Sequence, residues 1–240
     1  MAIVTAGSPD HQKPDGHEPA EYAVLCSAGL DSSVLVAYLA QRARVLPLYV
    51  SVGFAWEVQE QAALARLAGT RPFQDRVRPP VTLHFDMRDV HPAHHWAITG
   101  TPPAFDTPDE DVYIPGRNIV LLTKAALTAA TRQISHLALG PLAGNPFPDA
   151  TPQFFESLAV ALSLGLNHPI AIAAPFASLS KAAVIHLGMT LGVDLGLTLS
   201  CMNPRDGRHC GRCSKCRERR DAFHEAGLTD PTAYASTPVR

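Results

Sequence analysis

The stretch YAVLCSAGLDSS, residues 22–33, joins a short apolar run to a turn of small and hydroxyl side chains, and a helical pattern follows it. The apolar run predicts a buried parallel strand. Backbone N–H groups without helical partners and the positive end of the helix would converge on the turn, an arrangement that binds phosphate. The turn lacks the Gly-Lys-Ser/Thr of a Walker loop. These residues alone leave two interpretations open, a phosphate-binding turn and an ordinary strand-to-helix turn.

The chain up to about residue 195 alternates between strand-like and helix-like patterns. Four further apolar runs predict strands, at 45–52, 81–87, 134–140 and 170–176. Helices are predicted at 57–68 and 119–133, from Pro152, and after Ser180 to residue 191. This alternation predicts an α/β fold with a doubly wound, mostly parallel sheet. Ligands of such sheets bind beyond the carboxyl ends of the strands, where the turn at 27–33 lies.

Four cysteines near the C-terminus are spaced C-x8-C-x2-C-x2-C, at Cys201, Cys210, Cys213 and Cys216. Two-residue spacings let successive thiolates reach one ion, and four sulfur ligands suit a closed, structural zinc site. An iron–sulfur cluster is the alternative, because four thiolates also suit one. The fifth cysteine, Cys26, ends the first apolar run and is expected in the core.

The composition is that of a globular chain, with 240 residues, 46% hydrophobic side chains and a net charge of −2. This charge predicts no general attraction to nucleic acid or to a membrane surface. No apolar stretch approaches the roughly 18 residues of a membrane span. The first 20 residues are polar, contain three prolines and lack a signal-peptide core. We therefore expect a cytoplasmic protein whose clustered thiols serve a metal rather than disulfides.

Three segments together carry a resemblance to a known family: SAGLDS at 27–32, IPGRN at 114–118 and CGRCSKCR at 210–217. The first is similar to the Ser-Gly-Gly-x-Asp-Ser loop of the PP-loop ATP pyrophosphatases, with Ala28 in place of the first glycine. In order and interval the three segments resemble the 7-cyano-7-deazaguanine synthase family of the queuosine pathway. The resemblance implies an adenine nucleotide alpha hydrolase-like sheet with a small C-terminal four-cysteine zinc-binding subdomain.

The same resemblance implies a reaction. ATP adenylates the carboxylate of 7-carboxy-7-deazaguanine, and ammonia converts the adenylate to the amide. A second ATP then activates the amide for dehydration to the nitrile, with AMP and pyrophosphate as the favoured products. The implied partners are a small-molecule carboxylate, ATP with Mg²⁺, and ammonia, with a homodimer as a further expectation. Neither a membrane nor a nucleic acid is expected as a partner.

The resemblance also divides the chain into four parts. We expect a disordered tail at 1–20, a PP-loop ATP-binding domain at 21–195, a zinc-binding subdomain at 196–226 and a C-terminal tail at 227–240. The first boundary coincides with the end of the polar, proline-containing segment. The third part holds all four of the clustered cysteines.

Adenylation needs groups that hold ATP and neutralise the charge of the leaving pyrophosphate. The expected nucleotide-binding residues are those of the loop, namely Ser27, Ala28, Gly29, Leu30, Asp31, Ser32 and Ser33. Three residues are expected to be catalytic. Asp31 would hold the turn or Mg²⁺, because an ionised carboxylate cannot donate to an anion. Arg117 and Lys181 would contact phosphate, the alternatives being a surface arginine at a helix start and a solvated lysine in a first helical turn.

A purine-like base needs a flat apolar wall and a carboxylate for its amino edge. Asn145, Phe147 and Asp149 are the residues expected to bind it, in a segment that resembles the family's Asp-Tyr-Ser-Gly-Tyr-Pro-Asp-like stretch. The alternative is a proline-bounded turn whose aspartate serves a helix N-terminus.

Two departures from the family pattern keep other functions open. Residues 53–57 read Gly-Phe-Ala-Trp-Glu where the family has a polar Tyr-Gly-Gln-Arg-His-like segment, and Ala143 or Gly144 replaces an aspartate. One alternative is a paralogous PP-loop enzyme that amidates or adenylates a different carboxylate. The other is a tRNA-modifying zinc-ribbon ATP pyrophosphatase, which the basic run at 205–220 would suit.

Overall fold

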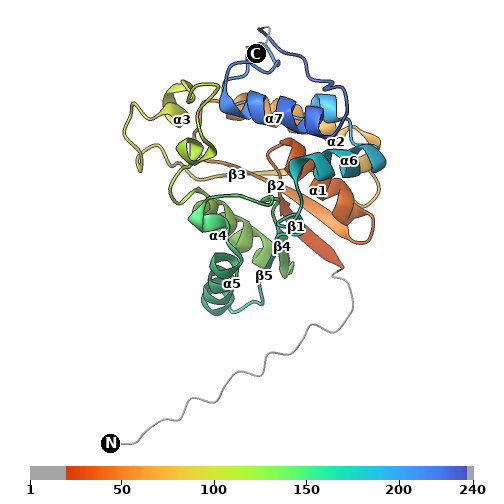
Figure 1. Cartoon of the computed structure of the whole chain (residues 1–240). Helices are drawn as coiled ribbons and strands as arrows, with labels where there is room; N and C mark the ends of the chain where they lie inside the picture. Colours follow the sequence, from red (N-terminus) through yellow and green to blue (C-terminus); the bar gives the residue numbers. More distant parts are fainter. Residues whose placement is uncertain (1–19, 237–240) are drawn as a thin grey trace, which may run out of the picture.

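The computed structural model describes residues 20–236 and contains a five-stranded sheet with helices on both faces (Figure 1). The strand order is β3-β2-β1-β4-β5, and every neighbouring pair is parallel. The chain builds outward from β1 through β2 to β3, then returns to the other side of β1 for β4 and β5. The predicted doubly wound parallel sheet is therefore confirmed. The strands are β1 Glu21–Leu25, β2 Arg44–Ser51, β3 Val81–His84, β4 His136–Ala138 and β5 Ala171–Ala173.

Seven α-helices connect or follow these strands in the described part of the chain. They are α1 Leu30–Ala40, α2 Glu57–Ala68, α3 Trp96–Thr99, α4 Arg117–Thr131, α5 Pro152–Leu166, α6 Lys181–Thr190 and α7 Ser214–Glu225. Short 3-10 turns lie at Arg71–Phe73, Asp109–Val112, Pro148–Ala150 and Leu195–Leu197. Within residues 20–236, no helix combines the length and the apolar character needed to cross a bilayer.

The strands after β2 are shorter than their apolar runs predict. Ile134 and Ile170 are buried, yet they precede the first ladder residues of β4 and β5. Hydrophobicity reports burial, whereas a strand also requires hydrogen bonds to a neighbouring strand. The expected helix at 57–68 matches α2 at both ends, because its amphipathic pattern and its helical span coincide.

Pro47 lies within the internal strand β2, at a position where the sheet can tolerate a proline. The N–H of Val45 donates to Arg76 on the β3 side, so the alternation of a strand places the position of Pro47 on that side as well. The ladder with β3 begins only at Leu48, which pairs with Val81. The missing N–H of Pro47 thus meets no carbonyl of the β3 ladder, and no ladder hydrogen bond is lost there.

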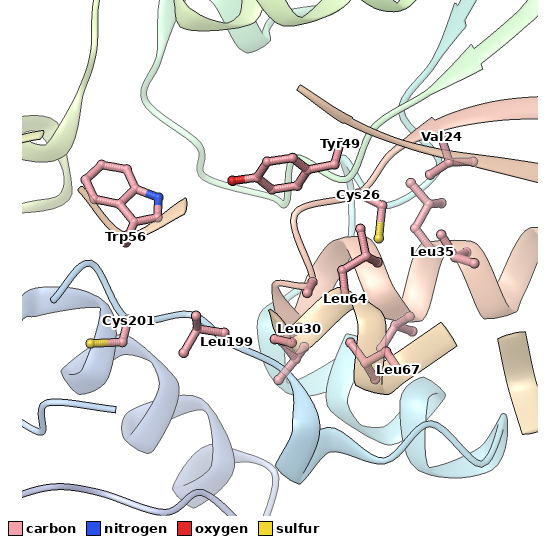
Figure 2. Close-up of a cluster of buried hydrophobic side chains, with 14 of the residues drawn as sticks. Val24, Cys26, Leu30, Leu35, Tyr49, Trp56, Leu64, Leu67, Leu199 and Cys201 are labelled. Atoms are coloured by element: carbon pink, nitrogen blue, oxygen red, sulfur yellow. The ribbon is translucent and has the colours of Figure 1, made fainter. Parts of the chain in front are cut away.

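Two hydrophobic cores lie on the two faces of the sheet. One packs β1 and β4 against α4 and α5, through residues such as Leu122, Leu137 and Phe155. The larger packs the other face against α1, α2 and α6, and it also includes Leu199 and the four clustered cysteines. Figure 2 shows Leu199 and Cys201 in the same cluster as Leu30. The division at residue 196 stays a prediction, because the cysteine segment packs directly on the core of the preceding part.

The expected tails are only partly within the described range. Of the tail at 1–20, residue 20 alone is described. In the segment at 227–240, Leu228 and Tyr234 pack against the large core, and the Tyr234 hydroxyl donates to Asp230 at 2.6 Å. The buried guanidinium of Arg219 donates to the Leu195 carbonyl at 2.7 Å and lies 3.5 Å from Asp230. The buried charge of Arg219 therefore links this C-terminal segment to α7.

The close approach of α1 and α6 requires a glycine at position 188. A Cβ atom there would lie 2.8 Å from Val34 Cγ2 and 3.0 Å from Leu195 Cδ2. We expect Gly188→Ala to destabilise the protein by about 1–2 kcal/mol, since overpacking outweighs the roughly 1 kcal/mol gain in helix propensity. Gly165 in α5 has open space around it and is the matched control. Gly165→Ala should stabilise by about 0.5–1 kcal/mol in urea unfolding. Equal stabilisation by both variants would contradict the tight α1–α6 contact.

Candidate active site

The loop after β1 lies at the carboxyl edge of the sheet, where the strand order reverses between β1 and β4. Its serine side chains brace the turn. The Gly29 N–H donates to Ser27 Oγ at 3.4 Å, and Ser32 Oγ donates to the Gly29 carbonyl at 3.2 Å. Helix α1 begins at Leu30, so Asp31 already lies in its first turn. The start of α1 lines the cavities at this edge, and the N-terminus of a helix favours an anion.

Ala28 adopts the backbone conformation that glycine favours. Its φ is +60°, its side chain is fully buried, and its carbonyl accepts a hydrogen bond from the Leu199 N–H at 2.8 Å. An alanine in this region costs about 1–2 kcal/mol relative to an ordinary φ. The chain therefore keeps the turn geometry without the family's first glycine, and holds it through packing.

Two adjoining cavities open at this edge of the sheet. Their volumes are about 290 Å³ and 380 Å³. Of the expected loop residues, five line one or both cavities, whereas Ala28 and Ser33 are buried behind the surface. The expected catalytic and substrate residues also converge on these cavities. The side chains that line both are Ser27, Asp31, Glu60, Val112, Arg117, Pro141, Asn145 and Phe147.

Lys181 is the centre of a partly buried ion cluster. Its Nζ lies 3.2 Å from Asp31 Oδ2 and 2.5 Å from Glu218 Oε1, and Lys215 Nζ lies 2.7 Å from the other oxygen of Glu218. Burial alone would lower the pKa of Lys181, but the two carboxylates raise it above its ordinary value. Burial would raise the pKa of Glu218, and the two lysines instead lower it to about 2. Lys181 and Glu218 are thus both charged at neutral pH.

Asp31 has one carboxylate oxygen that remains available. Oδ2 accepts from Lys181, whereas Oδ1 is buried and has no hydrogen-bond partner in the described structure. A buried, unpaired carboxylate oxygen beside a phosphate-binding turn fits a hard cation such as Mg²⁺, which takes one or two carboxylates together with phosphate oxygens.

Arg117 is the first residue of α4, and its charge points into the site rather than to bulk solvent. It lines both cavities, and its Nε is buried without a hydrogen-bond partner in the described structure. The guanidinium carbon lies 5.9 Å from the centre of the Phe54 ring. Gly116, with φ +76°, turns the chain immediately before the helix. The surface alternative for Arg117 is therefore not supported.

Two further carboxylates in the site were missed by the analysis of the sequence. Glu57 and Glu60 are both buried in the first turn of α2. Glu57 accepts from Ser51 Oγ at 2.6 Å and from the Val52 N–H at 2.7 Å, and Glu60 accepts from the Tyr49 hydroxyl at 2.8 Å. Acidic residues in a first helical turn are usual, because they complement the helix dipole. Their place after the second strand was the signal that could have identified them.

Glu60 titrates near neutral pH. Burial raises the pKa of Glu60 to about 7, although Arg117 and the Tyr49 hydroxyl act to lower it. Figure 2 shows the Tyr49 hydroxyl directed away from the aliphatic cluster. A carboxylate poised at this pKa inside a cavity is a candidate for proton transfer.

The expected base-binding segment follows β4 and lines the same cavities. The ring of Phe147 stacks on Tyr113, with centroids 5.2 Å apart and planes 24° apart, and Asn145 Oδ1 accepts from the Phe147 N–H. Asp149 is buried and accepts from the Asn118 backbone N–H at 3.0 Å and from the Asn118 side chain at 3.3 Å. Asp149 therefore also caps the start of α4, so its role toward a base stays a prediction.

The four cysteines meet at one point. Their sulfur atoms all lie within 4.8 Å of one another, and the closest pairs are 3.5–3.9 Å apart. Tetrahedral zinc with Zn–S bonds of about 2.3 Å requires sulfur separations of about 3.8 Å, so the site fits this ion. N–H groups at Asn203 and Cys210 donate to Cys201 Sγ, which favours the thiolate. The adjacent His209 is not part of the cluster, because its Nε2 accepts from the Ser200 N–H.

Cys26 is separate from the cluster and lies in the large core. Burial raises the pKa of its thiol to about 11. The expectation of a core cysteine is confirmed.

The family model and the curated relatives of this chain point to the same family. The family model of queuosine biosynthesis protein QueC matches residues 21–227. A 7-cyano-7-deazaguanine synthase from Azoarcus sp. (strain BH72) is 42% identical over 149 residues, which cover 56% of this chain and 65% of the relative. One from Anaeromyxobacter dehalogenans (strain 2CP-C) is 45% identical over 130 residues, covering 51% and 56%. These two alignments thus span less than two thirds of the relatives.

A longer alignment covers almost the whole chain. The 7-cyano-7-deazaguanine synthase of Xanthomonas campestris pv. campestris (strain B100) is 33% identical over 221 residues, which cover 88% of this chain and 96% of the relative. Among solved structures, a predicted subunit of tRNA methyltransferase from Methanocaldococcus jannaschii DSM is 16% identical with a TM-score of 0.47, covering 90% of this chain and 93% of that one.

The cysteine geometry predicts that Cys213→Ser removes the bound metal. We expect about one zinc per chain in the unaltered protein and a loss of several kcal/mol of stability in the variant, because metal binding contributes directly to folding. Elemental analysis and thermal unfolding of the two proteins measure both effects. Cys26→Ala is the control and should retain the metal. Iron with sulfide in the purified protein would contradict zinc.

The positive φ of Ala28 predicts a small effect on stability for one substitution there and a large effect for another. Ala28→Gly should change stability by no more than about 1 kcal/mol, because relief of strain offsets the lost methyl group and the greater chain entropy of glycine. Ala28→Val should be strongly destabilising, since a β-branched residue fits this conformation poorly. Thermal unfolding and ATP titration test both variants. Loss of ATP binding in Ala28→Gly would show that the methyl group itself shapes the turn.

Proposed function

The chain belongs to the queuosine biosynthesis protein QueC family, and from this membership we propose that it is an ATP-dependent carbon–nitrogen ligase that makes 7-cyano-7-deazaguanine. Its substrates would be 7-carboxy-7-deazaguanine, ATP and ammonia. The observation that supports the proposal most is the convergence of the phosphate-type turn, Arg117 and Lys181 on two adjoining cavities. Two cavities that meet at a phosphate-binding turn suit a nucleotide and a second, smaller ligand.

The first step would join the two substrates. A carboxylate oxygen of the acid attacks the α-phosphorus of ATP, and pyrophosphate leaves. Arg117 and Lys181 would neutralise the charge that develops on the phosphates, and the N–H groups before α1 would hold the leaving group. Asp31 would hold Mg²⁺ through its unpaired oxygen, and this ion would supply further positive charge to balance the phosphates.

Formation of the amide and its dehydration to the nitrile would follow at the same carbon. Ammonia attacks the acyl carbon of the adenylate and AMP leaves, which forms the amide. The amide oxygen then attacks a second ATP, and loss of the activated oxygen with the amide protons gives the nitrile. Both activations use the same phosphate geometry, so one site serves for both. AMP and pyrophosphate are the products that this chemistry predicts.

Recognition of the base would fall to the segment after β4. The stacked rings of Phe147 and Tyr113 offer a flat wall, and Asn145 lines both cavities. We propose that Asp149 also contacts the amino edge of the base, since each carboxylate oxygen retains a second lone pair beyond its bond to Asn118.

A paralogous reaction on a different carboxylate is the second candidate, and the segment at 53–57 favours it. Phe54 and Trp56 are buried, and Trp56 lines the larger cavity. Aromatic side chains therefore form a wall where the family pattern has polar ones, which would alter the shape offered to the acid. The chemistry of the phosphate turn would be unchanged.

Zinc is the metal that we propose for the cysteine cluster, because four sulfur ligands leave no open position and the separations fit tetrahedral coordination. The cluster would then be structural. We propose a cytoplasmic location, where such thiols would stay reduced, and the homodimer stays a prediction.

One incubation tests the substrate. The purified protein with ATP, Mg²⁺, ammonium and 7-carboxy-7-deazaguanine should yield the amide and then the nitrile by mass spectrometry, with AMP as the nucleotide product. Asp149→Asn should raise the KM for the acid about tenfold, corresponding to the loss of one charged hydrogen bond of about 1.5 kcal/mol, and leave the KM for ATP unchanged.

Three outcomes would count against this assignment. ADP in place of AMP contradicts the pyrophosphatase chemistry. AMP release with another carboxylate, but not with this acid, favours the paralogous enzyme. An equal rise in both KM values for Asp149→Asn limits Asp149 to holding the start of α4.

A further inference from the structure

The nitrogen donor must reach the carbon that joins the base to AMP, so it must arrive where the two cavities meet. In the proposed reaction this carbon lies between the phosphate turn and the base-binding segment. Side chains that line both cavities are therefore the ones that can touch the incoming nitrogen. Two carboxylates belong to this set, Asp31 and Glu60.

A carboxylate is needed there because ammonium cannot act as a nucleophile. Near neutral pH most ammonia is protonated, and its nitrogen lone pair is occupied by the proton. A group at the junction must attract this cation and accept its proton. Asp31 is ion-paired with Lys181. Glu60 accepts from the neutral hydroxyl of Tyr49, and no ion pair to its carboxylate occurs among the described residues.

The other carboxylates near the cavities are already engaged. Both oxygens of Glu57 accept hydrogen bonds, from Ser51 and from the Val52 N–H. Asp149 is held by Asn118, and Glu218 by two lysines. Each of these three lines only one of the two cavities. Glu60 is the carboxylate that combines access to the junction with freedom from an ion pair.

We propose that Glu60 binds the ammonium ion at the junction and accepts its proton, so that ammonia is released beside the acyl-adenylate. This inference rests on the proposed ligase reaction and adds a catalytic residue to it. Tyr49 is then a positioning residue, because its hydroxyl holds the carboxylate from β2.

The proton and bond changes balance without a further reactant. Ammonium gives one proton to the Glu60 carboxylate and becomes ammonia. The freed lone pair forms the C–N bond, and the bond between the acyl carbon and the AMP oxygen breaks. A further proton leaves the nitrogen of the newly formed C–N bond and is accepted by the phosphate of the departing AMP. Glu60 returns its proton to solvent before the next turnover.

The surroundings of Glu60 support this role. Burial raises its pKa to about 7, which makes it a stronger base than an ordinary carboxylate while leaving a useful ionised fraction. The groups that face it are Arg117 from α4, Tyr49 from β2, and Trp56 and Glu57 at the start of its own helix. Arg117, Tyr49 and Trp56 favour the carboxylate form, and Glu57 opposes it.

The test measures adenylation and amide formation separately in the Glu60→Gln variant. Pyrophosphate exchange into ATP, dependent on 7-carboxy-7-deazaguanine, reports adenylation alone. Amide formation from ammonium chloride reports the whole sequence. We expect the variant to keep exchange and to lose amide formation about 10²–10⁴-fold near neutral pH. Thermal unfolding verifies that the variant is folded.

The pH dependence distinguishes proton transfer from a structural role. At a fixed total ammonium concentration, raising the pH supplies free ammonia, so the deficit of Glu60→Gln relative to the unaltered protein should shrink by at least about tenfold. Glu57→Gln is the matched control, one turn away on the same helix. It should show no amide deficit that shrinks as the pH rises. Its amide profile should instead move toward lower pH, because the charge of Glu57 raises the pKa of Glu60. Tyr49→Phe removes a hydrogen bond that lowers the pKa of Glu60 and should shift the amide profile toward higher pH.

Two results overturn the inference. Loss of exchange together with amide formation in Glu60→Gln shows that Glu60 serves adenylation. A deficit that stays constant with pH shows that it does not transfer this proton. Absence of exchange in the unaltered protein contradicts the proposed function itself, and this inference falls with it.

Discussion

The partly buried ion cluster around Lys181 is the interaction on which the arrangement of the site depends. Its carboxylate partners come from two different helices, Asp31 from α1 and Glu218 from α7. A buried ammonium without partners would be costly, and removing either carboxylate would leave the cluster unbalanced. The phosphate-type turn, the start of α6 and the cysteine-bearing segment are therefore held in one arrangement. The cysteine cluster is thus linked to the site, and its member Cys201 also lines the larger cavity.

The site contains more acidic groups than an anion-binding site needs. Its ligands under the proposed function are ATP and a carboxylate, yet five carboxylates line the cavities against three cations. Three features reduce this excess. Lys181 pairs with two of the carboxylates, burial raises the pKa of Glu60 and of Asp149, and the open oxygen of Asp31 suits a divalent cation. ATP binding should consequently depend strongly on Mg²⁺.

The segment that departs from the family pattern has a packing role. Phe54 and Trp56 are buried with ring centroids 5.3 Å apart, and Trp56 stacks on Trp96 at 5.5 Å. These rings join the turn after β2 to the short helix α3, and so build one wall of the larger cavity. The exchange of polar for aromatic residues thus changes a wall of the site while the turn after β1 keeps its form. We therefore expect such a change to affect which carboxylate binds more than it affects the chemistry at the phosphates.

The sequence by itself determined the features that depend on short covalent spacing or on periodicity. These include the alternating elements, the turn at 27–33 and the cysteine set, because their geometry follows from neighbouring residues. Tertiary structure alone decided which charges meet. Asp31 and Lys181 are 150 positions apart, and Glu60 becomes a site residue only because β2 places Tyr49 beside it and α4 brings Arg117 near. A local pattern cannot report these partners, since a charge is neutralised or made reactive by whatever elements pack around it.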